Sequence, residues 1–95
     1  MSGDRASAHS AGFAALADPT RRSILGLLHA RGVLSAGELA RAFPHISRPA
    51  VSRHLRVLRE SGLVTVERSG REQRYVLGAD ALARLHHEWF SRFTG

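Results

Sequence analysis

The segment from Ile46 to Val64, ISRPAVSRHLRVLRESGLV, limits most strongly what this chain can fold into. Ser47 can cap a helix, and Pro49 suits the first helical turn that would follow it. Ser61-Gly62 would end that helix. The apolar residues within it recur at helical spacing and define one edge, formed by Val51, Leu55 and Leu58. The segment therefore predicts a short helix that is buried along that edge.

The opposite face of this expected helix is basic. Arg53 and Arg56 lie about half a turn away from the apolar edge, and Ser52 lies on the flank. A short helix with Arg and Ser on its exposed face suits the major groove of DNA. A surface helix with a solvated charged face shows the same pattern, so this segment alone leaves both interpretations open.

The segment that follows, LVTVERSGREQRYVL from Leu63 to Leu77, predicts a β-hairpin. Two runs rich in Val, Thr, Leu and Tyr flank Ser69-Gly70-Arg71, and Gly70 can adopt the positive φ that a tight turn needs. Such a hairpin would lie along the DNA backbone or reach into the minor groove, where Arg is favoured. Its tip and flanks carry Arg68, Arg71 and Arg74.

A helix of this kind beside a basic hairpin is the layout of a winged helix-turn-helix. An ordinary hairpin with basic side chains is the alternative, but it does not explain the charge distribution. Seven of the fourteen arginines fall between Arg48 and Arg74, against only three acidic residues in that segment. We therefore expect a mostly α-helical fold with a small β-hairpin, in the order α-α-α-α-β-β-α, that binds double-stranded DNA.

The overall charge agrees with a nucleic-acid partner. The 95 residues suffice for one domain of modest core, and the net charge of +6 comes with Arg as the only strongly basic residue type. Arg offers a planar fork that fits phosphates and guanine edges. An anionic membrane surface would also attract a basic chain. No apolar run approaches the ~20 residues of a membrane span, so we expect no membrane association.

Composition also bounds the cellular setting and the domain organisation. Cysteine is absent, which excludes disulfides, thiolate switches and thiolate metal sites. The first residues, MSGDRASAHS, lack the apolar core of a signal peptide, so a cytoplasmic protein is expected. We expect a flexible N-terminal segment over 1–9 and a single winged helix-turn-helix DNA-binding domain over 10–95, with a dimerisation helix over 79–93.

Three helices are expected before the basic one. Asp18-Pro19 is a strong start signal, because Asp is a good N-cap and Pro fits the first helical position. Ser35 and Glu38 form a capping box that would open the next helix, and Pro44 would stop it. These signals place the helices over 10–17, 19–30 and about 36–43.

The last expected helix, over 79–93, has a strongly apolar and aromatic face. A domain of this size has little remaining core to cover that face, and leaving it in water would expose an unusual patch. We expect it to pair with its copy in a homodimer, with the first helix contributing; packing on its own domain is the alternative. A two-fold dimer would place the two basic helices about one DNA turn, ~34 Å, apart. The expected interface comprises Phe13, Leu82, Leu85, His86, Trp89, Phe90 and Phe93.

From Leu16 to Leu77, about two-thirds of its length, the chain resembles the ArsR-type winged-helix repressors of bacteria. The matching pieces, in order, are ALADPTRRSIL, ELA, SRPAVSRHLRVLRESGLV and SGREQRYVL. The resemblance implies a homodimeric transcriptional repressor, often acting on its own operon, that binds an imperfect palindrome. By position, it also implies which residues meet DNA. They are Ser47, Arg48, Ser52, Arg53 and Arg56 on the recognition helix, and Arg71 at the wing.

The chain departs from the metal-sensing members of that family. Those members resemble one another in a Cys pair just after the Glu-Leu pair of the third helix, where this chain has Ala40 and Ala42. A second family site uses Asp/His and His/Glu pairs on the dimer helix, and the spacing here does not fit. His86 is interpreted as a histidine of the dimer interface. We therefore expect no metal and no cofactor, as in the cysteine-free members. A metal-responsive repressor with His and carboxylate ligands is kept as an alternative.

Two other classes of function remain open. A winged helix can serve as a protein-interaction module with only non-specific affinity for DNA. An enzyme is the least favoured class, because the chain has no Cys, no HExxH motif and no Gly-rich phosphate loop. The sequence identifies no effector, and it does not choose between repression and activation.

Overall fold

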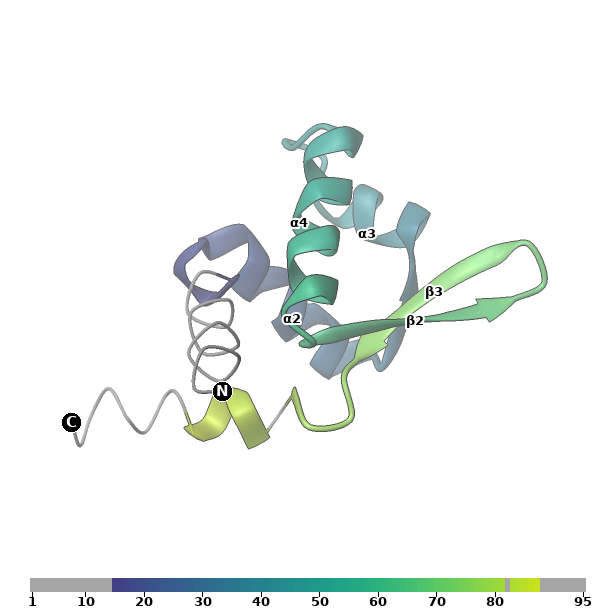
Figure 1. Cartoon of the computed structure of the whole chain (residues 1–95). Coiled ribbons are helices and arrows are strands. Elements are labelled where there is room, and N and C mark those ends of the chain that lie inside the picture. Colours follow the sequence, from purple (N-terminus) through teal and green to yellow (C-terminus); the bar gives the residue numbers. More distant parts are fainter. Residues whose placement is uncertain (1–14, 82, 88–95) are drawn as a thin grey trace.

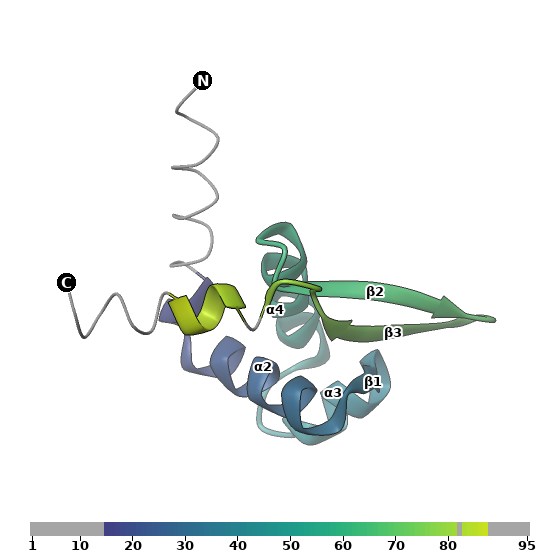
Figure 2. The ribbon, with the colours of Figure 1, turned by 90° about the horizontal axis from the view of Figure 1, so that it is seen from below.

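The computed structural model describes residues 15–81 and 83–87. Residues 15–17 are helical and lead into three helices and three strands, followed by further helical residues over 83–87. In chain order the elements are α2 (Pro19–Arg31), β1 (Val33–Ser35), α3 (Ala36–Ala42), α4 (Arg48–Glu60), β2 (Val64–Ser69) and β3 (Glu72–Leu77). Figure 1 shows the β2–β3 hairpin projecting from a helical body, and Figure 2 shows the same projection from below.

The expected start signals of the helices are confirmed. The Asp18 carboxylate accepts a hydrogen bond of 3.0 Å from the Arg21 backbone N–H at the start of α2. Ser35 and Glu38 form the reciprocal capping box of α3, with hydrogen bonds of 3.0 and 3.1 Å. Ser47 caps α4 by accepting from the Ala50 N–H at 3.2 Å. Each cap satisfies backbone donors that have no partner within the helix.

The expectation of only two strands was wrong. Val33–Ser35 forms a third strand, β1, which pairs antiparallel with β3 in a sheet of order β1-β3-β2. A strand of three residues, the last of which caps the next helix, is too short to show an alternating pattern. Its partner strand lies about 40 residues further along the chain. Tertiary pairing, which no local signal reports, therefore makes this strand.

The hairpin forms where it was expected, with Gly70 in its turn. Ser69 pairs with Glu72, which leaves Gly70 and Arg71 as a two-residue turn. Gly70 has a φ of 64°, and no described residue other than glycine has a positive φ. Glycine at the first of two turn positions is typical of a type II′ turn, whose twist matches that of the flanking strands. The tip of the hairpin extends beyond β1, which pairs only with residues 74–76 of β3.

The core lies between the helices and the sheet. The buried edge of α4 is the one expected, and it packs on α2, α3 and β2. Burying a Leu or Val side chain stabilises the fold by roughly 1.5–3 kcal/mol, so this edge firmly orients α4. The buried apolar residues are Ala15, Ile24, Leu25, Leu28, Leu34, Leu39, Val51, Leu55, Leu58, Leu63, Val64, Tyr75 and Ala81.

Two glycines meet where the end of α4 and the end of the sheet approach each other. Gly78 donates a hydrogen bond of 2.9 Å to the Leu63 carbonyl and accepts one of 3.0 Å from the Ala81 N–H. A Cβ added at Gly78 would collide with the backbone carbonyl oxygen of Gly62. The chain can therefore leave the sheet and start its next helical turn here only because the side chain is absent.

We predict that Gly78→Ala lowers the free energy of unfolding by about 1–3 kcal/mol, because the added methyl group must displace backbone rather than a flexible side chain. Urea denaturation at fixed protein concentration measures the change. Gly37→Ala is the matched control, since a Cβ there would make only an ordinary 3.5 Å contact with the Arg41 side chain. That variant should be neutral or slightly stabilising. Similar losses for the two variants would contradict the close-approach explanation.

Candidate nucleic-acid interface

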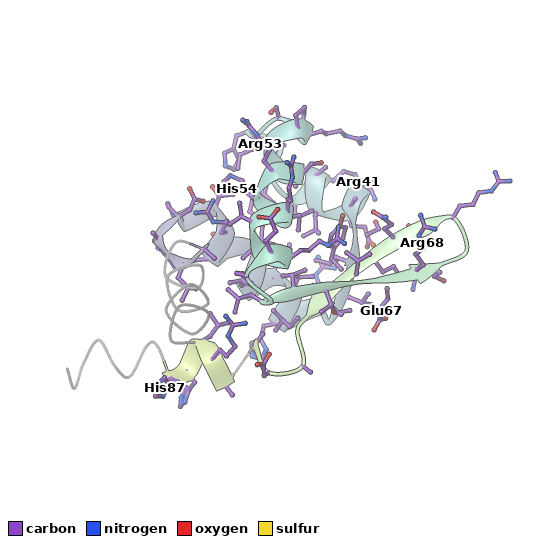
Figure 3. The ribbon with its side chains drawn as sticks, viewed as in Figure 1. Arg41, Arg53, His54, Glu67, Arg68 and His87 are labelled. Atoms are coloured by element: carbon purple, nitrogen blue, oxygen red, sulfur yellow. The ribbon has the colours of Figure 1, made fainter. Side chains whose placement is uncertain are left out.

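The exposed face of α4 carries basic and hydroxyl side chains in the arrangement that the sequence predicts. Ser52, Arg53 and Arg56 are exposed along the helix, and Arg48 is exposed in its first turn. Figure 3 shows Arg53 near the end of α4 that lies farthest from residues 83–87. The first turn contains no acidic residue, so the positive end of the helix dipole adds to the arginine charges. This face can bind phosphates or donate hydrogen bonds to the edges of bases.

Ser47 has a structural role in addition to its predicted contact with DNA. Its hydroxyl oxygen accepts from the Ala50 N–H, and its side chain lies at the exposed start of α4. A hydroxyl that accepts one hydrogen bond can still donate its own hydrogen. Ser47 can therefore cap the helix and donate to a phosphate at the same time.

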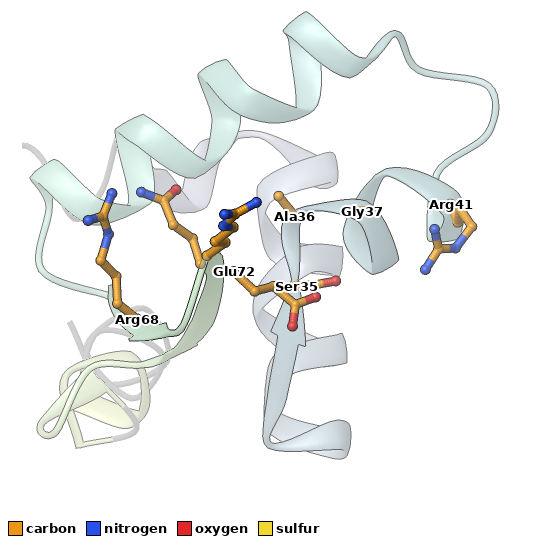
Figure 4. Close-up of a pocket in the computed structure, with 8 residues that line it drawn as sticks. Ser35, Ala36, Gly37, Arg41, Arg68 and Glu72 are labelled. Atoms are coloured by element: carbon orange, nitrogen blue, oxygen red, sulfur yellow. The ribbon is translucent and has the colours of Figure 1, made fainter.

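The wing carries its arginines beside α3. Arg68 and Arg71 are exposed, and together with Glu72 and Gln73 they line one side of an open groove of about 520 Å³. The other side of the groove comes from residues 35–37 and Arg41 of α3 (Figure 4). Arg41 was not among the predicted site residues. Its place beside the wing is a tertiary fact that its local sequence does not signal.

Arg74, the third wing arginine of the sequence analysis, is differently placed from the other two. Its guanidinium lies 3.5 Å from the Glu72 carboxylate, and both side chains are about half exposed. An exposed pair of this kind contributes little to stability. Arg74 does not line the groove, whose basic side chains are Arg41, Arg68 and Arg71.

A polar cluster joins the start of α2 to the middle of α4. His54 Nδ1 lies 3.9 Å from the Asp18 carboxylate and 3.3 Å from the Arg21 guanidinium. The His54 side chain is 21% exposed, so the cluster is shielded on most sides. His54 thus lies at the edge of the buried face of α4.

The electrostatics of Asp18 follow from that cluster. Partial burial raises the pKa of the Asp18 carboxyl, but other contributions outweigh it. The hydrogen bond from the Arg21 backbone and the charges of His54 and Arg21 hold the pKa below its ordinary value of 3.8. Asp18 is therefore ionised at neutral pH and serves as both helix cap and counter-charge.

Arg21 and Arg22 lie in the first turn of α2, where their charge opposes the helix dipole. In the structure, the side chains of both arginines donate to backbone carbonyls of the preceding helix. The Arg21 Nε–H donates to the Ala15 carbonyl at 3.0 Å, and the Arg22 guanidinium donates to the Leu16 carbonyl. Both acceptors belong to the last turn of the preceding helix, whose final carbonyls lack helical partners. The two arginines thus cap the helix that ends before Asp18.

Most of the predicted dimer residues lie outside the described residues, namely Phe13, Leu82, Trp89, Phe90 and Phe93. Leu85 is half-buried, packs against the core and lines an apolar hollow of about 210 Å³ with Leu16, Leu25 and Leu77. His86 is exposed in the single chain. Figure 3 places the neighbouring His87 at the opposite end of the molecule from Arg53. A dimer formed there would leave the face of α4 uncovered.

The described part of the chain has neither clustered metal ligands nor a membrane-spanning helix. Within residues 15–81 and 83–87, no group of three or more His, Cys, Asp or Glu side chains could hold a metal ion. No helix in the same part of the chain is both long enough and apolar enough to cross a membrane.

The sequence is similar to known regulators of transcription. A family model described as a helix-turn-helix domain matches residues 16–67, more than half of the chain. The HTH-type transcriptional regulator Rv2034 of Mycobacterium tuberculosis is 46% identical over 85 residues, which cover 85% of this chain and 78% of that protein. The transcriptional repressor SdpR of Bacillus subtilis is 40% identical over 70 residues, covering 74% of this chain and 76% of the repressor.

Solved structures show the same likeness in three dimensions. An ArsR-like transcriptional regulator from Rhodococcus sp. RHA1 superposes with a TM-score of 0.73 at 36% identity, covering 95% of this chain and 90% of that one. A possible transcriptional regulator for arsenical resistance superposes with a TM-score of 0.74 at 42% identity, covering 85% and 82%. The expected winged helix-turn-helix fold is confirmed by these matches together with the observed order of elements.

We predict that ionised Asp18 stabilises the fold, and that this contribution depends on pH. Because the folded pKa lies below the unfolded value near 3.8, the contribution is complete above that pH and is lost as pH falls through the folded pKa. Asp18→Asn keeps a capping oxygen but cannot titrate. The wild type should therefore exceed this variant in unfolding free energy at pH 7, and the difference should shrink below about pH 4. Urea denaturation of the wild type and the variant, at pH 7 and below about pH 4, measures this difference in unfolding free energy. An equal difference at the two pH values would contradict the prediction.

Proposed function

The chain belongs to the ArsR family of helix-turn-helix transcriptional regulators, and we propose that it is a homodimeric repressor that binds an inverted repeat in double-stranded DNA. The observation that carries this proposal is the exposed arginine face of α4 beside the arginine-lined groove of the wing. A regulator of this kind acts by binding rather than by catalysis. Its place of action is the cytoplasm, where bacterial DNA lies.

On this proposal α4 is the recognition helix and enters the major groove. Arg53 and Arg56 lie where a guanidinium can donate to a guanine edge or to a phosphate, and Ser52 lies on the same face. Ser47 and Arg48, at the start of the helix, contact the backbone phosphates, as the N-termini of recognition helices commonly do. The buried edge of α4 supports this role, because it leaves these side chains exposed.

The wing contacts DNA beside the site of α4. Arg68 and Arg71 lie along the backbone or enter the minor groove, where Arg is favoured. Arg41, on the opposite side of the same groove, adds a phosphate contact between the recognition helix and the wing. Three positive groups around one open groove suit a polyanionic strand better than a small neutral ligand.

The terminal helices form the dimer on this proposal. On the same proposal, residues 10–95 constitute one domain. The half-buried Leu85 and the apolar hollow that it lines support this proposal. A two-fold axis through this region would place two copies of α4 about one DNA turn apart, in adjacent major grooves. The proposed interface comprises Phe13, Leu82, Leu85, His86, Trp89, Phe90 and Phe93.

The proposal is tested by fluorescence anisotropy on the DNA upstream of the chain's own gene and on a scrambled duplex of equal composition, across a series of salt concentrations. We expect a preference for the native duplex that persists at about 0.15 M salt. Equal affinities that vanish together as salt rises would contradict a sequence-specific regulator. That result would favour a protein-interaction module with only non-specific affinity for DNA.

We predict that Arg53→Ala weakens operator binding by about 1–3 kcal/mol and relaxes the preference at one base position, because a bidentate contact to guanine is lost. Anisotropy on operators with single base changes measures both effects. A loss that is uniform across all these duplexes would show that Arg53 contacts only phosphate.

We predict that Arg41→Ala weakens binding to the same extent on all these duplexes, because the proposed partner of Arg41 is a phosphate. The slope of log affinity against log salt should fall by about one, with no change in base preference. Arg31→Ala is the control, because it removes the same charge from a side chain that is exposed at the C-terminal end of α2. Equal slopes for the wild type and the Arg41 variant would remove Arg41 from the interface.

A further inference from the structure

One side chain joins three parts of the molecule near the recognition helix. The Arg21 Nε–H donates to the Ala15 carbonyl at 3.0 Å, and its terminal nitrogen lies 3.3 Å from His54 Nδ1. Arg21 itself belongs to α2, Ala15 to the helix that precedes α2, and His54 to the middle of α4. Both contacts are partly buried. A single guanidinium therefore spans the end of the preceding helix and the recognition helix.

The chemistry of this contact fixes its direction. A guanidinium has hydrogen-bond donors but no acceptor, so in this hydrogen bond Arg21 donates and His54 Nδ1 accepts. Asp18 holds Arg21 in place, because its carboxylate accepts from the Arg21 backbone N–H at 3.0 Å. Among the described residues, Asp18 and Arg21 are the charged groups that face the ring from α2.

The Arg21–His54 contact lies where it can control the angle between α4 and the preceding helix. His54 directly follows Arg53, a proposed DNA contact, and Figure 3 shows the two labels next to each other along α4. The apolar edge of α4 fixes which of its faces is buried, but apolar contacts are not directional. A hydrogen bond is directional, so the Arg21–His54 contact limits the angle that α4 makes with the preceding helix.

We propose that Arg21 is a positioning residue that sets the orientation of the recognition helix relative to the preceding helix, and thereby selects the spacing between the two half-sites of the operator. This inference rests on the proposed dimeric function. In a symmetric dimer, the separation of the two recognition helices depends on how rigidly each is joined to the helices of the interface. The helix that Arg21 contacts at Ala15 is one of those proposed interface helices.

The neighbouring residue provides a matched control. The Arg22 guanidinium donates to the Leu16 carbonyl, so it also caps the preceding helix, but the hydrogen bond found for it does not reach α4. Arg21→Ala and Arg22→Ala each remove one positive charge and one cap of the same helix. Only the first variant removes the contact with His54.

The experiment compares three duplexes that carry the same inverted half-sites. One has the preferred centre-to-centre spacing, and the others are one base pair longer or shorter. A one-base-pair change moves a half-site by about 3.4 Å and rotates it by about 34° around the duplex axis. We expect the wild type and Arg22→Ala to bind the preferred duplex about tenfold more tightly than the other two. Arg21→Ala should reduce that preference several-fold, whatever its absolute affinity.

Variants of the acceptor separate positioning from folding. His54→Asn keeps an acceptor oxygen near the place of Nδ1, whereas His54→Leu keeps the bulk but no acceptor. The Asn variant should retain the spacing preference and the Leu variant should lose it, even where their melting temperatures are alike. If Arg21→Ala is too unstable to assay, this pair decides the question.

Two results would overturn the inference, and they are distinguishable. A wild type that prefers one spacing, with the same preference in Arg21→Ala and His54→Leu, would refute the role of Arg21 and leave the dimeric repressor intact. A wild type that binds all three duplexes equally would refute the dimeric repressor and this inference together.

Discussion

The burial of one edge of α4 is the constraint on which the rest of the structure depends. Val51, Leu55 and Leu58 are each at most 3% exposed, and they pack against α2, α3 and β2. A helix has one rotation about its axis that buries three such side chains at once. The same rotation leaves Ser52, Arg53 and Arg56 in solvent. Stability and presentation of the basic face thus follow from a single packing arrangement, which is why this segment can serve a regulator.

Polar contacts add the direction that apolar packing lacks. Ser47 fixes the start of α4, and the Asp18–Arg21–His54 cluster ties its middle to the first turn of α2. On the other side, β1 pairs with β3 and joins the wing to the residue that caps α3. The polar contacts of the recognition helix are therefore separate from those of the wing, although α4 also packs directly on β2. Both sets of polar contacts include residues of the segment between Ala15 and Ser35. That segment carries no proposed DNA contact.

The sequence predicted those parts of the fold that depend on local chemistry. Helix starts at Asp18, Ser35 and Ser47, and the turn at Gly70, are decided by one or two side chains and the backbone beside them, so they could be identified in advance. The strand β1, the place of Arg41 beside the wing and the Arg21–His54 contact could not. Each joins residues more than 25 positions apart, and their separate sequences contain no signal of the pairing.

On the proposed function, α4 and its copy in a second subunit read DNA sequence together. Selection of tight-binding duplexes from a random pool, at about physiological salt, tests this most directly because it needs no known operator. We expect enrichment of an inverted repeat whose half-sites lie about 10–11 base pairs apart, centre to centre. A pool that shows no enriched sequence, or only a single unpaired half-site, would contradict it.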